Sequence, residues 1–270
     1  MLIKRVLAAL VMAAIGIPAI IFGGIYYFLL IGFFLLMAAW EYVKIFEKSH
    51  HAPSMIITVG GVALVLLARN YLPDTSTILL TGLILLAMTF HLFTFEKGRD
   101  TAATDFAITL GGILYLGWLG AYLMDLRSLP QGLWWFFLTL GSVWIADSAA
   151  YFIGSKFGNH KLSPRLSPKK SWEGYFAGVL FGTLSAIGLT AAFQSWGGLN
   201  ASLWQGGLLG LVMSVFTTLG DLGESMIKRQ AGVKDSSSII PGHGGFLDRI
   251  DAWLWAAAIG YFMINWLFLG

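Results

Sequence analysis

Residues 174–195 read GYFAGVLFGTLSAIGLTAAFQS, a run without one charged side chain. A helix needs about 20 mostly apolar residues to cross a bilayer, so this run predicts a membrane-spanning helix. The rest of the 270-residue chain has the same character, because 57% of its residues are hydrophobic, 11% are charged and the mean hydropathy is +0.75. Soluble domains carry about a quarter charged residues, so a water-soluble protein is excluded.

Segments of this kind predict an all-α, polytopic membrane protein with about nine transmembrane helices. Their approximate bounds are 6–23, 25–46, 55–72, 77–95, 104–125, 133–153, 174–195, 202–222 and 252–269. The first segment follows two basic residues, as a signal peptide does, but more spans and no clear cleavage site come after it. We therefore interpret it as a retained anchor. Glycines four residues apart, at 174, 178 and 182 and at 206 and 210, predict close helix packing.

The basic residues are distributed unevenly. If nine helices alternate across the bilayer, all but two of the 17 Lys and Arg residues, Arg69 and Arg127, share a side with the N-terminus. Because positive charge marks the cytoplasmic side, we predict a cytoplasmic N-terminus in the cell membrane. The net charge of +3 is consistent with an anionic neighbour.

Hydropathy and charge also suggest a division of the chain. Residues 1–132 would form transmembrane helices 1–5, and residues 133–270 a C-terminal catalytic region with cytoplasmic motif loops at 154–173 and 223–251. The chain has no Cys, which excludes disulfides, thiolate zinc sites and cysteine catalysis.

The loop from Ser155 to Glu173, SKFGNHKLSPRLSPKKSWE, carries five basic residues and one acid. Lys and Arg bind phosphate oxygens, so Arg165, Lys169 and Lys170 are candidate substrate ligands. The same charges also suit an anchor on anionic lipid headgroups, and the loop alone does not decide between the two.

The stretch from Leu219 to Asp251, LGDLGESMIKRQAGVKDSSSIIPGHGGFLDRID, concentrates acids and bases in an otherwise charge-poor chain. Four of its five acids form two pairs with a spacing of three, which puts both members of each pair on one helix face. Carboxylates at a membrane surface suit Mg²⁺, which uses few protein ligands and keeps water and substrate phosphates. The candidate metal ligands are Asp221, Glu224, Asp248, Asp251 and, from the span 133–153, Asp147.

Glycines lie between the two acid pairs, in Pro241-Gly242-His243-Gly244-Gly245. Glycine lets backbone amides approach an anion closely, and neighbouring serines add hydroxyl donors. The candidate substrate ligands of this stretch are Ser237, His243, Gly244, Gly245 and Arg249, and the candidate catalytic residues are Asp221, Asp248, Asp251, Lys228, Arg229 and Lys234. Acids for a metal, bases for phosphate and a glycine loop together predict metal-assisted phosphoryl or nucleotidyl transfer. The sequence has no GxxxxGK[ST], which argues against a P-loop ATPase.

Structural interpretations stay open for several of these residues. Glu224 and Lys228 are four apart and suit a plain surface ion pair, and Glu41 could pair with Lys44 in the same way. Asp248 and Arg249 suit ordinary loop charges, and the glycines suit a tight turn. His243 is either a phosphate donor or a turn residue.

The segment from Ser225 to Asp251 resembles the signature of the phosphatidate cytidylyltransferases, also called CDP-diacylglycerol synthases. Its pattern is S-x-hydrophobic-K-R, four residues, K-D, a short spacer and H-G-G-x-x-D-R-x-D, and every fixed position is matched. The segments 147–151 and 163–174 are similar to conserved upstream regions of the family. The N-terminal half matches mainly in hydropathy and in Glu41.

The resemblance implies a reaction for phospholipid biosynthesis, in which phosphatidic acid attacks the α-phosphorus of CTP and gives CDP-diacylglycerol and pyrophosphate. It implies Mg²⁺, a second cation such as K⁺, and a homodimer within membrane lipids, with an active site facing the cytoplasm and no nucleic-acid partner. The expected roles follow from charge: Lys228, Arg229, Lys234 and Arg249 would neutralise CTP phosphates, and Arg165, Lys169 and Lys170 would hold the phosphatidate headgroup or the triphosphate.

Two other functional classes are compatible with parts of the sequence. A lipid or polyprenol kinase would use similar carboxylates but release a nucleoside diphosphate. A transporter would line a pathway with Asp147 and Glu41, but it predicts repeat symmetry and leaves the dense stretch 219–251 unexplained.

Overall fold

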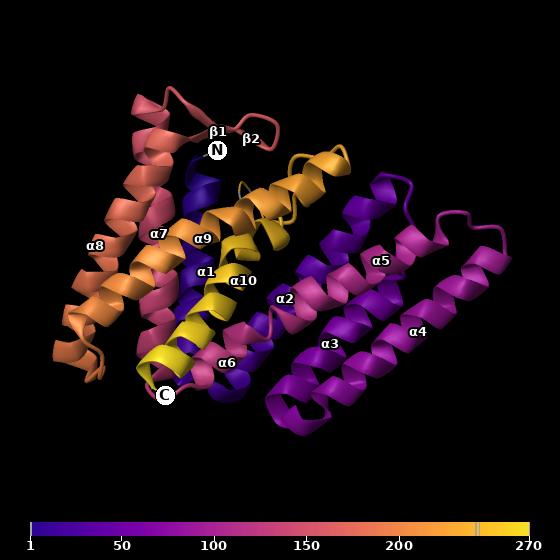
Figure 1. Ribbon diagram of the computed structural model, residues 1–270, viewed down its shortest axis with the longest axis horizontal. Helices are drawn as coiled ribbons and strands as arrows, with labels where there is room; N and C mark the ends of the chain where they lie inside the picture. Colours follow the sequence, from indigo (N-terminus) through magenta and orange to yellow (C-terminus); the bar gives the residue numbers. More distant parts are fainter. Residues whose placement is uncertain (1, 241, 243, 270) are drawn as a thin grey trace. The chain divides into compact units, whose positions relative to one another are not determined.

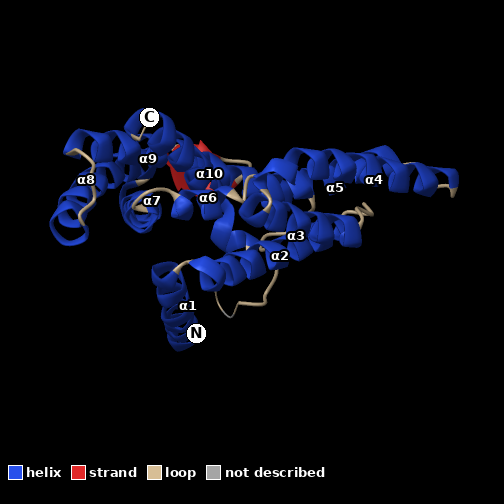
Figure 2. Cartoon of the chain, turned by 90° about the horizontal axis from the view of Figure 1, so that it is seen from below, coloured by secondary structure: helices blue, strands red, loops and turns tan. Residues whose placement is uncertain are grey.

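The computed structural model describes residues 2–240, 242 and 244–269, with side chains from residue 10 onward. Helices make up most of this part of the chain, with one short pair of strands (Figure 2). The helices of the first half are α1 (Leu2–Phe22), α2 (Gly24–Lys48), α3 (Met55–Tyr71), the 3₁₀ turn η1 (Pro73–Thr75), α4 (Ser76–Glu96), α5 (Ala102–Gly112), the π-helical turn η2 (Ile113–Trp118) and α6 (Tyr122–Ser128). The second half contains α7 (Gly132–Phe157), β1 (Lys161–Ser163), β2 (Ser167–Ser171), α8 (Trp172–Gly197), α9 (Leu203–Gln230), α10 (Leu247–Met263) and the π-helical turn η3 (Ile264–Phe268).

The predicted all-α class is confirmed, and each predicted span falls on helix. In the described part of the chain, seven helical stretches are long and apolar enough to cross a membrane, while Leu10–Phe22 and Met55–Tyr71 are shorter. The count of nine spans and the cytoplasmic N-terminus therefore stay predictions, and the side chains of Lys4 and Arg5 lie outside the described residues. The predicted break between the first two spans is present at Gly23 and Gly24, which adopt φ of +66° and +53°.

Contacts group the chain into two compact units. The first consists of Met1–Met124 and Ile227–Ile250, and the second of Asp125–Met226 and Asp251–Gly270. The predicted division at residue 132 follows hydropathy along the chain. The compact units follow packing instead, and they group part of the motif stretch 223–251 with the N-terminal helices.

In the first unit, α3 packs against α2 and α4, and α4 packs against α5 (Figure 1). Its apolar core contains Ile57, Val65, Leu83, Ala87 and Ile113. The predicted span 104–125 is broken into α5, η2 and α6, and glycines allow this irregular segment to approach its neighbours. A Cβ at Gly117 would lie 3.2 Å from the Cα of Val62, and one at Gly120 would lie 2.6 Å from Leu35 Cδ2.

In the second unit, the predicted glycine steps are confirmed as packing positions. A Cβ at Gly178 of α8 would lie 3.0 Å from the carbonyl oxygen of Ala146 on α7, and Gly182 of α8 faces Ser214 of α9. Gly210 of α9 lies against Ala186 of α8. The helices approach closely because no side chain separates their backbones.

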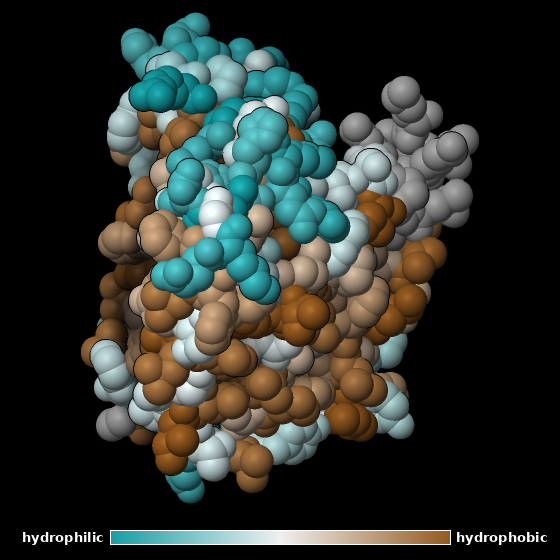
Figure 3. Space-filling view, turned by 90° about the vertical axis from the view of Figure 1, so that its right-hand side faces the viewer, coloured by the Kyte–Doolittle hydropathy of each residue, from teal (hydrophilic) through white to brown (hydrophobic). Residues whose placement is uncertain are grey.

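Apolar side chains cover much of the outer surface. Helix α4, for example, exposes Ile78, Leu85 and Phe93. Figure 3 shows one face of the molecule, which is largely hydrophobic, with hydrophilic side chains gathered toward one end. A surface of this kind suits contact with lipid chains flanked by a polar interface.

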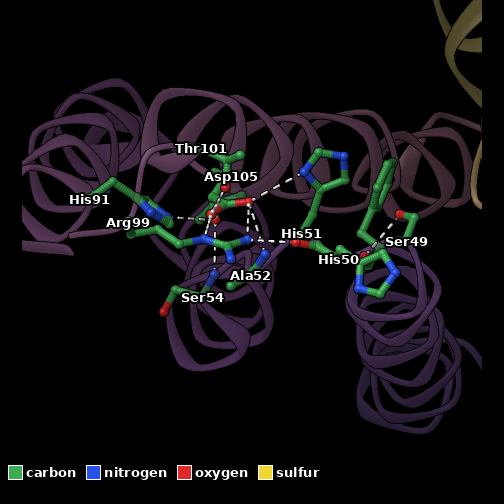
Figure 4. A network of polar contacts seen from close by, with 11 residues as sticks. Ser49, His50, His51, Ala52, Ser54, His91, Arg99, Thr101 and Asp105 are labelled. Carbon is green, nitrogen blue, oxygen red and sulfur yellow. Dashed lines mark hydrogen bonds and ion pairs between the residues drawn. The ribbon is translucent and has the colours of Figure 1, made fainter. Parts of the chain in front are cut away.

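A buried acid, Asp105 of α5, ties together the loops that follow α2 and α4 (Figure 4). Its carboxylate accepts hydrogen bonds from Arg99 Nε at 2.7 Å, Ala52 N at 2.8 Å and Thr101 Oγ1 at 3.2 Å. Arg99 also donates to the carbonyl of His50 at 2.7 Å. The hydrogen bond from Arg99 to Asp105 raises the pKa of the guanidinium. The network stabilises one end of the first unit.

Replacing this acid with its amide, Asp105→Asn, is expected to lower the stability of the protein by about 2 kcal/mol. The amide cannot accept from all three donors, and the estimate is modest because the Arg99 partner is partly exposed to solvent. Thermal unfolding in detergent would measure the loss. Asp100→Asn is the matched control, since Asp100 is exposed and close in sequence. Equal unfolding temperatures for the two variants would contradict this assignment.

Candidate active site

The predicted basic loop after the sixth span is a β-hairpin. Strands β1 and β2 pair antiparallel, and the side chain of Ser171 begins α8 by accepting from Gly174 N at 3.2 Å. Glu173 accepts from the backbone N–H of His160 at 3.1 Å and contacts its ring Nδ1 at 2.6 Å, which closes the base of the hairpin. The hairpin therefore holds its basic residues in a defined order rather than on a loose loop.

The three candidate bases of the hairpin have different surroundings. Arg165 lies in the turn and Lys169 on β2, and both are exposed. Lys170 is partly buried, and its Nζ lies 2.7 Å from Asp221 Oδ2 on α9. These two residues are 51 positions apart, and no spacing in the sequence indicates that they form a pair.

Three charged residues converge in the second unit around this ion pair. Asp147 of α7 is close enough to both Asp221 and Lys170 for their charges to interact. The grouping of Asp147 with Asp221 was expected, since an acid within a spanning helix usually faces a partner. Asp251 begins the second-unit part of α10, and a Cβ at Gly220 would lie 2.8 Å from its carbonyl oxygen. Glu224, one turn after Asp221, is buried.

The motif stretch 223–251 is less of a loop than expected. Helix α9 continues to Gln230, eight residues beyond the predicted end at 222, and α10 begins at Leu247, five residues before the predicted start. A polar residue lowers the hydropathy of a segment but does not end a helix. The spans predicted from hydropathy were therefore shorter than the helices. Residues 231–240, 242 and 244–246 are irregular. Gly232, whose φ is +71°, lies just after the end of α9.

In the first unit, Asp248 organises this irregular segment. Its Oδ2 accepts from Ser236 N at 2.9 Å, Ser236 Oγ at 2.8 Å and Gly245 N at 2.8 Å, and Lys228 Nζ lies 2.5 Å from its Oδ1. Asp248 is thus not an ordinary loop charge. It also sits in the first turn of α10, where a negative charge is favoured.

Glycine has two distinct uses in the segment. Gly244 has a φ of +80°, and its carbonyl accepts from Ile240 N at 2.9 Å, which makes a tight turn as one interpretation proposed. A Cβ at Gly245 would collide with Ser236 Oγ and with the carboxylate of Glu41. The Gly245 amide, expected to face phosphate, donates to Asp248 in this structure.

The other candidates of this stretch lie toward solvent. Lys234 and Arg249 are exposed, as is Arg229, which donates to the carbonyl of Val233 at 3.3 Å. His243 lies outside the described residues.

Glu41 is the residue whose surroundings the sequence did not reveal. The proposed pair with Lys44 is wrong, because Lys44 Nζ lies 2.6 Å from Glu47. Glu41 is fully buried and accepts from Ser237 Oγ at 2.6 Å, Leu247 N at 2.8 Å, Ser236 Oγ at 2.9 Å and Phe246 N at 3.0 Å. The feature of the sequence that could have indicated its burial is that Glu41 is a single acid within an apolar span.

The acids differ in how well they suit a divalent cation. Within the described residues, no group of three or more His, Asp or Glu side chains is arranged to hold a metal. Asp147 and Asp221 nevertheless fit Mg²⁺, which typically takes one or two carboxylates together with water and substrate phosphates. Asp221 and Asp248 would each have to exchange a lysine ammonium, that of Lys170 and that of Lys228, for the metal.

The arrangement defines a class of protein: a helical membrane enzyme whose acids and bases, at the ends of membrane helices and in a hairpin, suit chemistry on phosphates. Comparison with known proteins agrees. Residues 3–267 match the cytidylyltransferase family. Phosphatidate cytidylyltransferases of Pseudomonas aeruginosa, Synechocystis sp. and Staphylococcus epidermidis are 34%, 32% and 32% identical to the chain. These alignments cover 96%, 97% and 93% of this chain and 99%, 96% and 94% of the relatives, in the same order.

The chain therefore belongs to the cytidylyltransferase family and is an enzyme of the phosphatidate cytidylyltransferase type.

Proposed function

We propose that the protein transfers the cytidylyl group of CTP to phosphatidic acid, with Mg²⁺ as cofactor. A phosphate oxygen of phosphatidic acid forms a bond to the α-phosphorus of CTP, and the bond from that phosphorus to the bridging oxygen of the β-phosphate breaks. The products are CDP-diacylglycerol and pyrophosphate. The attacking oxygen belongs to a phosphate monoester that is already ionised near neutral pH, so the step requires no general base.

The observation that best supports this function is the pairing of each central lysine with an acid. Lys170 contacts Asp221, and Lys228 contacts Asp248. Each pair thus combines a cation that can bind phosphate with a carboxylate that can bind a metal ion. Phosphate oxygens would replace the acid at each lysine, because charge-assisted hydrogen bonds to phosphate are strong.

The other candidate residues fall into two groups, one in the motif stretch 223–251 and one on the hairpin. We propose that Lys228, Arg229, Lys234 and Arg249 bind the triphosphate, helped by Ser237, His243, Gly244 and Gly245. Arg165, Lys169 and Lys170 on the hairpin would bind the phosphatidate headgroup, where their charges face an anionic lipid. In this assignment, the two anionic reactants are held by different segments, and the protein mainly supplies orientation and charge neutralisation.

The metal would be held by Asp147 and Asp221, with Asp251 and Glu224 of the same unit as further ligands or as acceptors for its water molecules. Asp248 of the first unit is a separate candidate ligand. Bound Mg²⁺ would neutralise charge on the transferring group and the departing pyrophosphate. A second cation such as K⁺, a homodimer and a site that faces the cytoplasm in the cell membrane belong to the same proposal. The apolar helices support the membrane location.

Purified protein incubated with Mg²⁺, phosphatidic acid and CTP labelled at the α-phosphate is expected to form a labelled liponucleotide and release unlabelled pyrophosphate. Chelation of the divalent cation should abolish turnover, and added Mg²⁺ should restore it. Labelled CDP in place of the liponucleotide would identify a lipid kinase and overturn the proposal. Formation of both expected products without a divalent cation would remove only the metal from it.

A further inference from the structure

Glu41 is joined by four hydrogen bonds to residues of the motif stretch that lie far from it in the sequence. Four donors surround the two oxygens of this carboxylate, two hydroxyls and two backbone amides, over a sequence separation of about 200 residues. A carboxylate accepts only, and the Ser236 hydroxyl has a single hydrogen, which it shares between Glu41 and Asp248. The contact sets both the shape of the segment and its position on α2.

A purely structural role explains this arrangement poorly. Burying a carboxylate is costly, and well-packed apolar side chains stabilise a membrane helix bundle at least as well. The two amides belong to Phe246 and Leu247, at the start of α10, and the two hydroxyls belong to Ser236 and Ser237, at the other end of the segment. Glu41 thus holds both ends of one irregular segment. This contact fixes the conformation of the segment more than it adds to the stability of the protein.

The contact is also connected to Asp248. The hydroxyl of Ser236 lies 2.9 Å from Glu41 Oε2 and 2.8 Å from Asp248 Oδ2, so one side chain joins the two acids. Gly245 has to be glycine, since a Cβ there would occupy the space of the Glu41 carboxylate and of Ser236 Oγ. A substitution at Glu41 is therefore expected to change the position of Asp248, the acid that pairs with Lys228.

We propose that Glu41 is a positioning residue for nucleotide binding. It holds the segment 236–247 in the shape that presents the neighbouring bases Lys234 and Arg249 to the triphosphate, without contacting the substrate itself. The inference rests on the proposed function, in which these bases bind CTP while the hairpin binds phosphatidic acid. It predicts an effect on one substrate and not on the other.

The test is the Glu41→Gln variant, which keeps the shape of the side chain but places an NH₂ group against donors. Its KM for CTP is expected to rise about tenfold or more, as for the loss of a hydrogen bond to a charged group, with the KM for phosphatidic acid within about twofold of wild type. Glu47→Gln is the matched control on the same helix, because Glu47 is exposed and its carboxylate pairs with Lys44. The control is expected to leave both constants unchanged.

A structural role would give a different pattern. Partial unfolding reduces the active fraction, so it lowers the apparent kcat and leaves both KM values in place. That pattern, or equal changes in the two KM values, would overturn the proposal. Ser237→Ala, which removes one of the four donors, should raise the KM for CTP by a smaller factor and should add little in the Glu41→Gln background. Full additivity of the two changes would also count against the proposal.

Calorimetric binding of α,β-methylene-CTP with Mg²⁺ separates this inference from the proposed reaction. Weaker binding by Glu41→Gln than by Glu47→Gln supports the positioning role whether or not the wild-type protein forms CDP-diacylglycerol. Equal binding by the two variants overturns it. Absence of the liponucleotide product from the wild-type protein contradicts the proposed function alone.

Discussion

Asp248→Asn is expected to lower kcat/KM for CTP by about a hundredfold or more, because it leaves the buried charge of Lys228 without its partner in the proposed nucleotide site. The side chains of Lys228 and Asp248 are both largely buried, so the lysine would keep its charge without its acid partner. The amide would also place an NH₂ group against Ser236 N, Gly245 N or Lys228. The segment 236–247 and the proposed nucleotide site would be disordered together.

Turnover of this variant over a wide range of Mg²⁺ concentrations separates two roles of the acid. If Asp248 binds the metal, high Mg²⁺ should recover part of the activity. If it only organises the segment, the loss should be independent of Mg²⁺. Asp100→Asn, at an exposed acid of the first unit, is the control and should match wild type. Near wild-type turnover of Asp248→Asn at every Mg²⁺ concentration would remove Asp248 from both roles.

Asp221→Asn and Lys170→Met are each expected to lose about a hundredfold or more in kcat/KM, but for opposite reasons. Loss of the acid should raise the Mg²⁺ requirement, since Asp221 and Asp147 are the acids that best fit the cation. Loss of the lysine should raise the KM for phosphatidic acid and leave the Mg²⁺ requirement close to wild type. Initial rates with each of the three components varied in turn would distinguish the two patterns.

Stability should change little in these two variants. Both side chains of the pair are partly exposed, and an ion pair of that kind contributes about 1 kcal/mol or less. Lys161→Met on the same hairpin is the matched control for Lys170→Met, because Lys161 is exposed and outside the proposed site. A large drop in unfolding temperature for Lys170→Met, or an equal loss of activity in Lys161→Met, would contradict the assigned role.

The motif residues could be found in the sequence because their chemistry is unusual for the chain. Lys170, Asp221, Lys228 and Asp248 are charges in a sequence that is only 11% charged, and their types alone indicate phosphate chemistry. Their partners could not be found in this way. The spacing of Glu224 and Lys228 suggested a helical ion pair, which stays a prediction. The contact of Lys228 with Asp248 had no such signal, because the two residues are 20 positions apart and are brought together by α9 and α10 in the first unit.

The glycine segment shows the same limit. Glycine at 244 and 245 indicated a turn or an anion-binding loop, and both are consistent with a backbone that needs a positive φ or a close approach. Which atoms approach Gly245 depends on Glu41, and nothing within 20 residues of Gly245 in the sequence indicates that acid. The amide of Gly245 donates to Asp248 for the same reason: the segment is folded around two carboxylates.

Hydropathy and charge are local properties of the chain, and they were enough to determine a helical membrane protein and the approximate positions of its long helices. The residue signature at 225–251 was enough to indicate the family. The pairing of acids with bases, the hairpin that orients Lys170 and the burial of Glu41 beneath the motif segment were decided only by tertiary structure. A hydrogen bond depends on distance and direction between two groups, and for residues about 200 positions apart these are set by how helices pack.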